Sequence, residues 1–93
     1  MRPPVRIKDV RPVYPPVAVS HNLRGVVVLE ATVDETGRVI ATRIVRSIPV
    51  LDQSTVNAVR QWEFYPTIVD GLPVRVPITV TAAFEAQRAD APR

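Results

Sequence analysis

The sequence contains no cysteine, one histidine and three glycines. Without cysteine the chain has no disulfides, no thiolate metal ligands and no cysteine nucleophile. There is no run of about 18 apolar residues, so we expect no segment that spans a bilayer as a helix. The first residues also lack the apolar stretch of a signal peptide. If the protein acts outside the cytoplasm, we expect its targeting or anchoring part to lie outside these 93 residues.

Groups that perform catalysis are equally scarce. His21 is the only histidine, and no Ser or Asp accompanies it in the order of a catalytic triad. Three glycines provide no phosphate-binding loop. Glu30, Asp34 and Glu35 lack the spacing of a metal-binding loop, and charges in a hairpin loop are expected for solubility alone. We therefore predict no enzymatic activity, no metal site and no cofactor.

The net charge of +3 comes mainly from arginines that are scattered along the chain. A basic balance favours an acidic partner, a membrane surface or nucleic acid, although dispersed arginines are more typical of a solvated surface. Nucleic-acid recognition also needs aromatic side chains on which bases stack. Only five aromatic residues are present, and the pattern places Trp62 and Phe84 in the core. We expect no nucleic-acid partner, and a basic nucleic-acid-binding domain stays the less favoured alternative.

The length allows one domain with a small core. Residues 1–13 contain three prolines and predict an extended lead-in, with room for a short strand. Residues 14–85 carry the apolar patterns of the folded domain. Residues 86–93 are polar and predict a flexible tail.

Two helices are expected. Tyr14-Pro15-Pro16 introduces a short one over residues 17–23, because proline is tolerated in a first helical turn. The second lies within residues 50–62, where one stripe is apolar or small. That stripe comprises Leu51, Thr55, Ala58, Val59 and Trp62.

A hairpin separates the two helices. Residues 26–33 alternate with one apolar face, and residues 34–37 supply a turn that ends in glycine. Residues 39–46 form the return strand. Its apolar positions Val39 and Ile44 have opposite parity, which a β-bulge would reconcile.

The last strand has the clearest pattern in the sequence. Apolar and polar residues alternate over twelve positions, 74–85, after a turn at Asp70-Gly71. The element order is therefore helix, strand, strand, helix, strand. We predict an α+β fold in which two helices pack on one face of a three-stranded antiparallel sheet.

Pro77 predicts that this last strand lies at an edge of the sheet, with its missing N–H directed away from the neighbouring strand. The backbone groups of Arg75, Thr79 and Thr81 would then face the open side. A long edge with few charges is typical of a docking surface for an extended peptide. Three alternatives remain: the edge is covered by residues 1–13, by a second copy of the domain, or by a part of the protein outside this sequence.

A set of characteristic residues and short motifs is distributed over most of the chain. The first half contains Tyr14-Pro15, Ala18, Gly25-Val26-Val27, Val33-Asp34, Gly37-Arg38-Val39 and Ser47. The second half contains Leu51-Asp52, Ala58-Val59, Trp62, Phe64, Pro66, Gly71, Pro73-Val74 and Phe84. In order and spacing these residues resemble the C-terminal domain of the TonB family. Ser54 and Thr55 replace paired alanines of the family, a small loss of helix propensity.

The resemblance implies a location and partners. Proteins of this family are anchored in the inner membrane of Gram-negative bacteria, where a motor complex energises them. Their C-terminal domain reaches through the periplasm and pairs with the TonB box of outer-membrane transporters. The resemblance thus implies a transducer in iron uptake and related transport. The same module in a sensor or a membrane peptidase, and a homodimer through the same edge, stay open.

The residues expected to bind the partner follow from the same resemblance and from the edge argument. They are Val74, Arg75, Val76, Pro77, Ile78, Thr79, Val80 and Thr81 of the last strand, together with Tyr14 and Pro15. For Tyr14 and Pro15, a structural role at the start of the first helix is an equal alternative.

Overall fold

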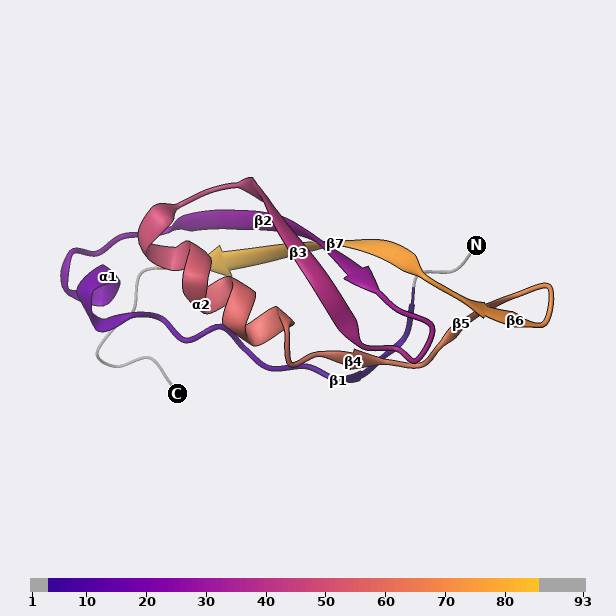
Figure 1. The fold of residues 1–93 in the computed structure, drawn as a ribbon. Coiled ribbons are helices and arrows are strands. Elements are labelled where there is room, and N and C mark those ends of the chain that lie inside the picture. Colours follow the sequence, from indigo (N-terminus) through magenta and orange to yellow (C-terminus); the bar gives the residue numbers. More distant parts are fainter. Residues whose placement is uncertain (1–3, 86–93) are drawn as a thin grey trace.

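The computed structural model describes residues 4–85 and shows an elongated α+β domain of about 49 × 27 × 19 Å (Figure 1). The predicted tail 86–93 lies outside the described residues. The elements are β1 (Arg6–Lys8), α1 (Pro16–Ser20), β2 (Gly25–Val33), β3 (Val39–Arg46), α2 (Pro49–Val59), β4 (Glu63–Phe64), β5 (Thr67–Val69), β6 (Leu72–Val74) and β7 (Val76–Phe84). The main sheet has the order β3-β2-β7 and is antiparallel. The predicted α+β fold is confirmed.

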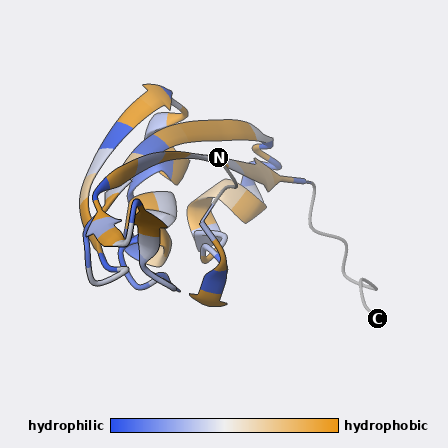
Figure 2. Cartoon of the chain, turned by 90° about the vertical axis from the view of Figure 1, so that its right-hand side faces the viewer, coloured by the Kyte–Doolittle hydropathy of each residue, from blue (hydrophilic) through white to orange (hydrophobic). Residues whose placement is uncertain are grey.

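β2 occupies the centre of the main sheet because one of its faces is entirely apolar. Val27, Leu29, Ala31 and Val33 are at most 1% exposed. Val27, Leu29 and Ala31 pack against residues of the two helices, so α1 and α2 cover the same face of the sheet. Figure 2 shows the strands curving over the two helices. This burial supplies most of the driving force for the fold, at about 25 cal/mol for each Å² of apolar surface removed from water.

β3 contains the predicted irregularity. Its pairing with β2 shifts register by one residue at Ile40 and again at Val45. Both residues are exposed, as expected for the extra residue of a bulge. The shift at Ile40 lets Val39 and Ile44 pack against the same core despite their opposite parity.

The two helices differ in length. α1 has only five residues and ends at Ser20, short of the predicted 23, because the chain turns through Asn22, whose φ is +54°. α2 begins at Pro49, and the Asp52 carboxylate accepts hydrogen bonds from the Ser47 hydroxyl and the Ile48 N–H. These bonds satisfy a donor that the first turn leaves free.

The predicted twelve-residue last strand is wrong in its length. Residues 72–74 form β6, which pairs with β5 across the turn at Asp70-Gly71. Both turn residues have positive φ, +51° and +79°, as a two-residue hairpin turn requires. Arg75 separates β6 from β7, which has nine residues. The alternation runs through both strands because Val74 and Val76 pack in the same cluster.

Gly37 joins the tip of the β2–β3 hairpin to β4. Its φ is +92°, and an added Cβ would lie 1.9 Å from the Phe64 carbonyl oxygen. The Phe64 N–H donates to the Gly37 carbonyl at 2.8 Å. This close approach positions Phe64 under the sheet, beside Val33 and Val76.

Candidate functional site

One long edge of the main sheet is open. β7 pairs with β2 at all nine of its residues, from Val76 opposite Val33 to Phe84 opposite Gly25, without a shift in register. Among residues 4–85 no strand pairs with its other side. The prediction that the last strand lies at an edge is therefore confirmed.

The two outer edges of the sheet differ in their protection. β3 carries two bulges and exposes Arg43 and Arg46. Bulges and charges are the usual means of preventing unwanted strand pairing. β7 has no bulge and no charged residue, and Pro77 is its only interruption. β7 is thus the edge that is suited to receive another strand.

Pro77 lies opposite Thr32 of β2. Because proline has no N–H, it fits an antiparallel strand where that group would face away from the neighbouring strand. Backbone groups alternate in direction along a strand, so the N–H groups of Thr79 and Thr81 would also face the open edge. The direction of these two N–H groups is a prediction that follows from the position of Pro77.

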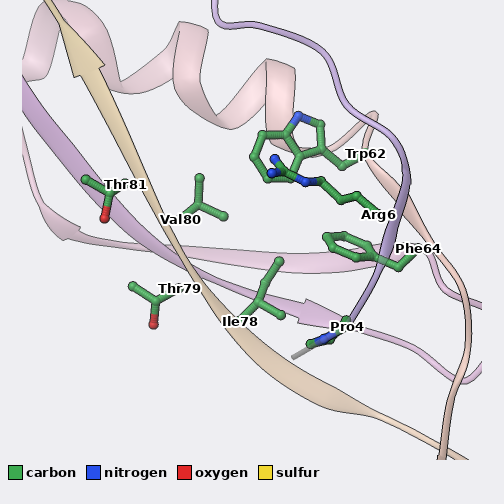
Figure 3. Close-up of a pocket in the computed structure, with 8 residues that line it drawn as sticks. All are labelled: Pro4, Arg6, Trp62, Phe64, Ile78, Thr79, Val80 and Thr81. Carbon is green, nitrogen blue, oxygen red and sulfur yellow. The ribbon is translucent and has the colours of Figure 1, made fainter. Parts of the chain in front are cut away.

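A groove of about 260 Å³ runs beside the free edge. It is lined by Pro4, Arg6, Trp62, Phe64 and residues 78–81 of β7 (Figure 3). Ile78 and Val80 point toward the aromatic side chains, whereas Thr79 and Thr81 point away from them. The groove therefore lies on the side of the sheet that faces the helices, next to the free edge of β7.

The far wall of the groove is held by the lead-in segment. The Arg6 guanidinium stacks 4.3 Å from the centroid of the Trp62 ring, and the Trp62 indole N–H donates to the Val10 carbonyl at 2.9 Å. β1 pairs with β4, and the Tyr65 N–H donates to the Val5 carbonyl at 2.9 Å. The described part of the lead-in thus pairs with β4 and leaves the edge of β7 uncovered.

The predicted partner-binding residues fall into three places. Val76, Pro77, Ile78, Thr79, Val80 and Thr81 lie on β7 as expected. Val74 belongs to β6, and Arg75 lies between the strands with its guanidinium 3.5 Å from Glu35. Neither extends the free edge of β7, because the hairpin turn pairs Val74 with Thr67.

Tyr14 and Pro15 lie at the other end of β7 from β6. The Tyr14 ring packs edge-on against Phe84, with centroids 5.5 Å apart, and its hydroxyl donates to the Leu23 carbonyl. The Pro15 carbonyl accepts hydrogen bonds from Ala18 and Val19 in the first turn of α1. The structure gives both residues a structural role and does not bring them into the groove.

Sequence reasoning missed the far wall of the groove. The pattern places Trp62 in the core, and its side chain does pack against the core, but it is only half-buried and its ring also lies under Arg6. Nothing in the sequence around Pro4 and Arg6 predicts that these residues lie near Trp62. Only the pairing of β1 with β4 brings them there.

The acidic residues considered above serve local structure. The Asp34 carboxylate accepts hydrogen bonds from the Thr36 hydroxyl and from the N–H groups of Thr36 and Arg38. These bonds, led by that of the Thr36 hydroxyl, lower the pKa of Asp34 below its ordinary value. Glu30 pairs with Arg43 across the hairpin. Within residues 4–85 no three His, Cys, Asp or Glu residues gather as metal ligands, and no helix is long and apolar enough to cross a membrane.

The fold and its free edge define a small α+β domain with one unprotected strand. Comparison with known proteins assigns the domain to a family. Residues 10–86 match the family described as the C-terminal of the Gram-negative bacterial TonB protein. The chain belongs to this family.

Two relatives support the assignment. The chain is 33% identical over 88 residues to Protein TonB of Vibrio cholerae. That match covers 92% of this chain and 36% of the relative, so the chain spans about a third of the length of this curated relative. The solution structure of the Pseudomonas aeruginosa TonB C-terminal domain superposes with a TM-score of 0.76 at 25% identity. The superposition covers 89% of this chain and 86% of the Pseudomonas aeruginosa domain.

Proposed function

We propose that this domain binds the TonB box of outer-membrane transporters by adding it as a strand to β7, and that it transmits energy from the inner membrane for uptake. The domain acts as a non-catalytic interaction module. It works in the periplasm as part of a protein anchored in the inner membrane, whose motor partners contact a region outside this chain. Family membership supports this role.

The observation that carries the proposal is the contrast between the two sheet edges. β3 is protected by bulges and arginines, whereas β7 offers nine residues in uninterrupted register with no charge. A peptide that pairs with such an edge gains main-chain hydrogen bonds whatever its sequence. Its side chains then lie alternately on the two faces of the sheet.

The expected affinity suits a contact that forms and breaks. About five new main-chain hydrogen bonds at about 1 kcal/mol net each, together with side-chain contacts, correspond to a roughly micromolar dissociation constant. A much tighter complex would need an apolar interface larger than the groove beside β7 provides.

An NMR titration with a synthetic TonB-box peptide tests the proposal. We expect the largest amide shifts at residues 76–84, with smaller ones in β2, which lies behind β7. The proposal is wrong if the shifts lie elsewhere, or if none appear at millimolar peptide. Self-association through the same edge is recognised by a mass that rises with protein concentration in light scattering.

A further inference from the structure

The groove beside β7 has two walls of different chemistry. One is the free edge of β7 at residues 78–81, and the other is formed by Arg6 over the Trp62 ring, with Phe64 next to it. Successive side chains of a strand point to opposite faces of its sheet. Every second side chain of a strand added to β7 therefore lies on the same face as Ile78 and Val80, and Figure 3 shows that this face opens into the groove.

We propose that the groove selects the bound peptide by its inward-facing side chains, and that Arg6 and Trp62 determine this specificity. The fitting occupant is an extended segment with aliphatic side chains at alternate positions and no positive charge on that face. This inference rests on the proposed function, because the groove is filled only when a strand pairs with β7.

The size of the groove supports side chains as its occupants. Its volume of about 260 Å³ is below the roughly 300–1,000 Å³ of pockets that enclose whole small molecules. Its inner lining is apolar, formed by Ile78, Val80, Phe64 and the Trp62 ring. An aliphatic side chain between β7 and the indole would leave water on burial, which favours it over a polar one.

Arg6 adds a charge to this apolar lining. Its Cζ atom lies over the indole, 4.3 Å from the ring centroid, and its side chain is 45% exposed. Arg6 forms an ion pair with Asp9, in which the guanidinium nitrogen and the carboxylate oxygen lie 3.7 Å apart. The Asp9 carboxylate is itself largely exposed. The guanidinium is always protonated, so its charge disfavours a lysine or arginine placed beside it in the groove.

The contribution of Pro4 and Arg6 has a consequence for related domains. Both residues precede residues 10–86, the part of the chain that matches the family. The segment ahead of the common domain thus supplies part of one wall of the binding groove. Peptide choice would then vary with this segment even where β7 is unchanged.

A serine scan of the peptide tests the inference with the whole 93-residue chain. Trp62 is the only tryptophan, so its fluorescence reports on the groove directly. We expect serine to weaken binding about tenfold at every second position, the loss of a largely buried aliphatic side chain, and to have little effect at the positions between. Binding should also change the Trp62 emission.

The protein variants are Arg6→Ala and its matched control Lys8→Ala, which removes the same charge from β1 outside the groove. We expect Arg6→Ala to weaken binding about threefold, the effect of losing a partly exposed cation–π contact and wall, and Lys8→Ala to leave it unchanged. A serine scan without alternation, or equal effects of Arg6→Ala and Lys8→Ala, overturns the inference. Strand addition still holds in that case if the peptide shifts the β7 amides. If no peptide shifts the β7 amides, strand addition and the inference both fail.

Discussion

Replacing Thr79 by proline separates the two possible directions of the β7 backbone. Thr79 lies opposite Glu30 of β2, two residues after Pro77, and its side chain is exposed on the face away from the helices. If its N–H faces the open edge, proline removes a donor that only a bound peptide uses. If its N–H faces β2, proline breaks the central ladder of the sheet.

The two cases differ in whether stability or peptide binding is lost. A proline that removes a ladder hydrogen bond leaves the facing carbonyl unsatisfied, which costs about 1–3 kcal/mol and lowers the melting temperature of a domain this small by roughly 5–20 °C. A proline at the open edge costs far less, because Ile78 before it is already extended, the conformation that a following proline favours. Peptide binding should lose about 2 kcal/mol, or about 30-fold, because one peptide carbonyl is left without its donor.

Thermal denaturation by circular dichroism measures the first effect, and calorimetric titration with the TonB-box peptide measures the second. Thr79→Ala is the control, since it changes the side chain and keeps the N–H. We expect Thr79→Pro to melt within a few degrees of the parent and to bind weakly, with Thr79→Ala close to the parent in both. A Thr79→Pro protein that unfolds, or one that binds the peptide normally, refutes the assigned direction.

Three further predictions concern stability. Gly37→Ala places a Cβ 1.9 Å from the Phe64 oxygen and should cost about 3 kcal/mol or more, whereas Gly71→Ala, with nothing within 4 Å, should cost about 1 kcal/mol; urea unfolding of both variants compares them, and equal losses would contradict the close approach. Asp34 has a lowered pKa, so its hydrogen bonds stabilise the fold fully above its ordinary pKa of 3.8, and this contribution is lost as pH falls through the lowered value. Between pH 6 and pH 3, Asp34→Asn should therefore lose less stability than the parent in urea unfolding, and an identical pH dependence would argue against the turn. Leu51→Ala removes a fully buried side chain and should cost about 3 kcal/mol by the same method, a value below 1 kcal/mol being inconsistent with the packing.

The elements that repeat a period were predictable from the sequence. β2 alternates without a fault, and α2 shows its apolar stripe, so their buried faces agree with the prediction. The bulge at Ile40 was also predictable, because Val39 and Ile44 cannot otherwise share one face. In each case the pattern of burial reflects one local geometry.

The break in the last strand was not predictable from alternation alone. Val74 and Val76 face the same core, so the period continues while the pairing partner changes from β5 to β2. The Asp70-Gly71 turn was visible, but the short strands beside it were not. The Arg6–Trp62 wall was hidden for a different reason, since it depends on a contact between segments that lie 56 residues apart in the chain.

Amide hydrogen exchange of β7, followed by NMR with and without the TonB-box peptide, tests the central claim most directly. Exchange is slowed where an N–H is hydrogen-bonded in the folded state. In the free protein we expect the Ile78 and Val80 amides to be protected by β2 and those of Thr79 and Thr81 to exchange fast. The peptide should slow Thr79 and Thr81 and leave Ile78 and Val80 unchanged. Thr79 and Thr81 amides that exchange equally fast under saturating peptide would contradict strand addition at this edge.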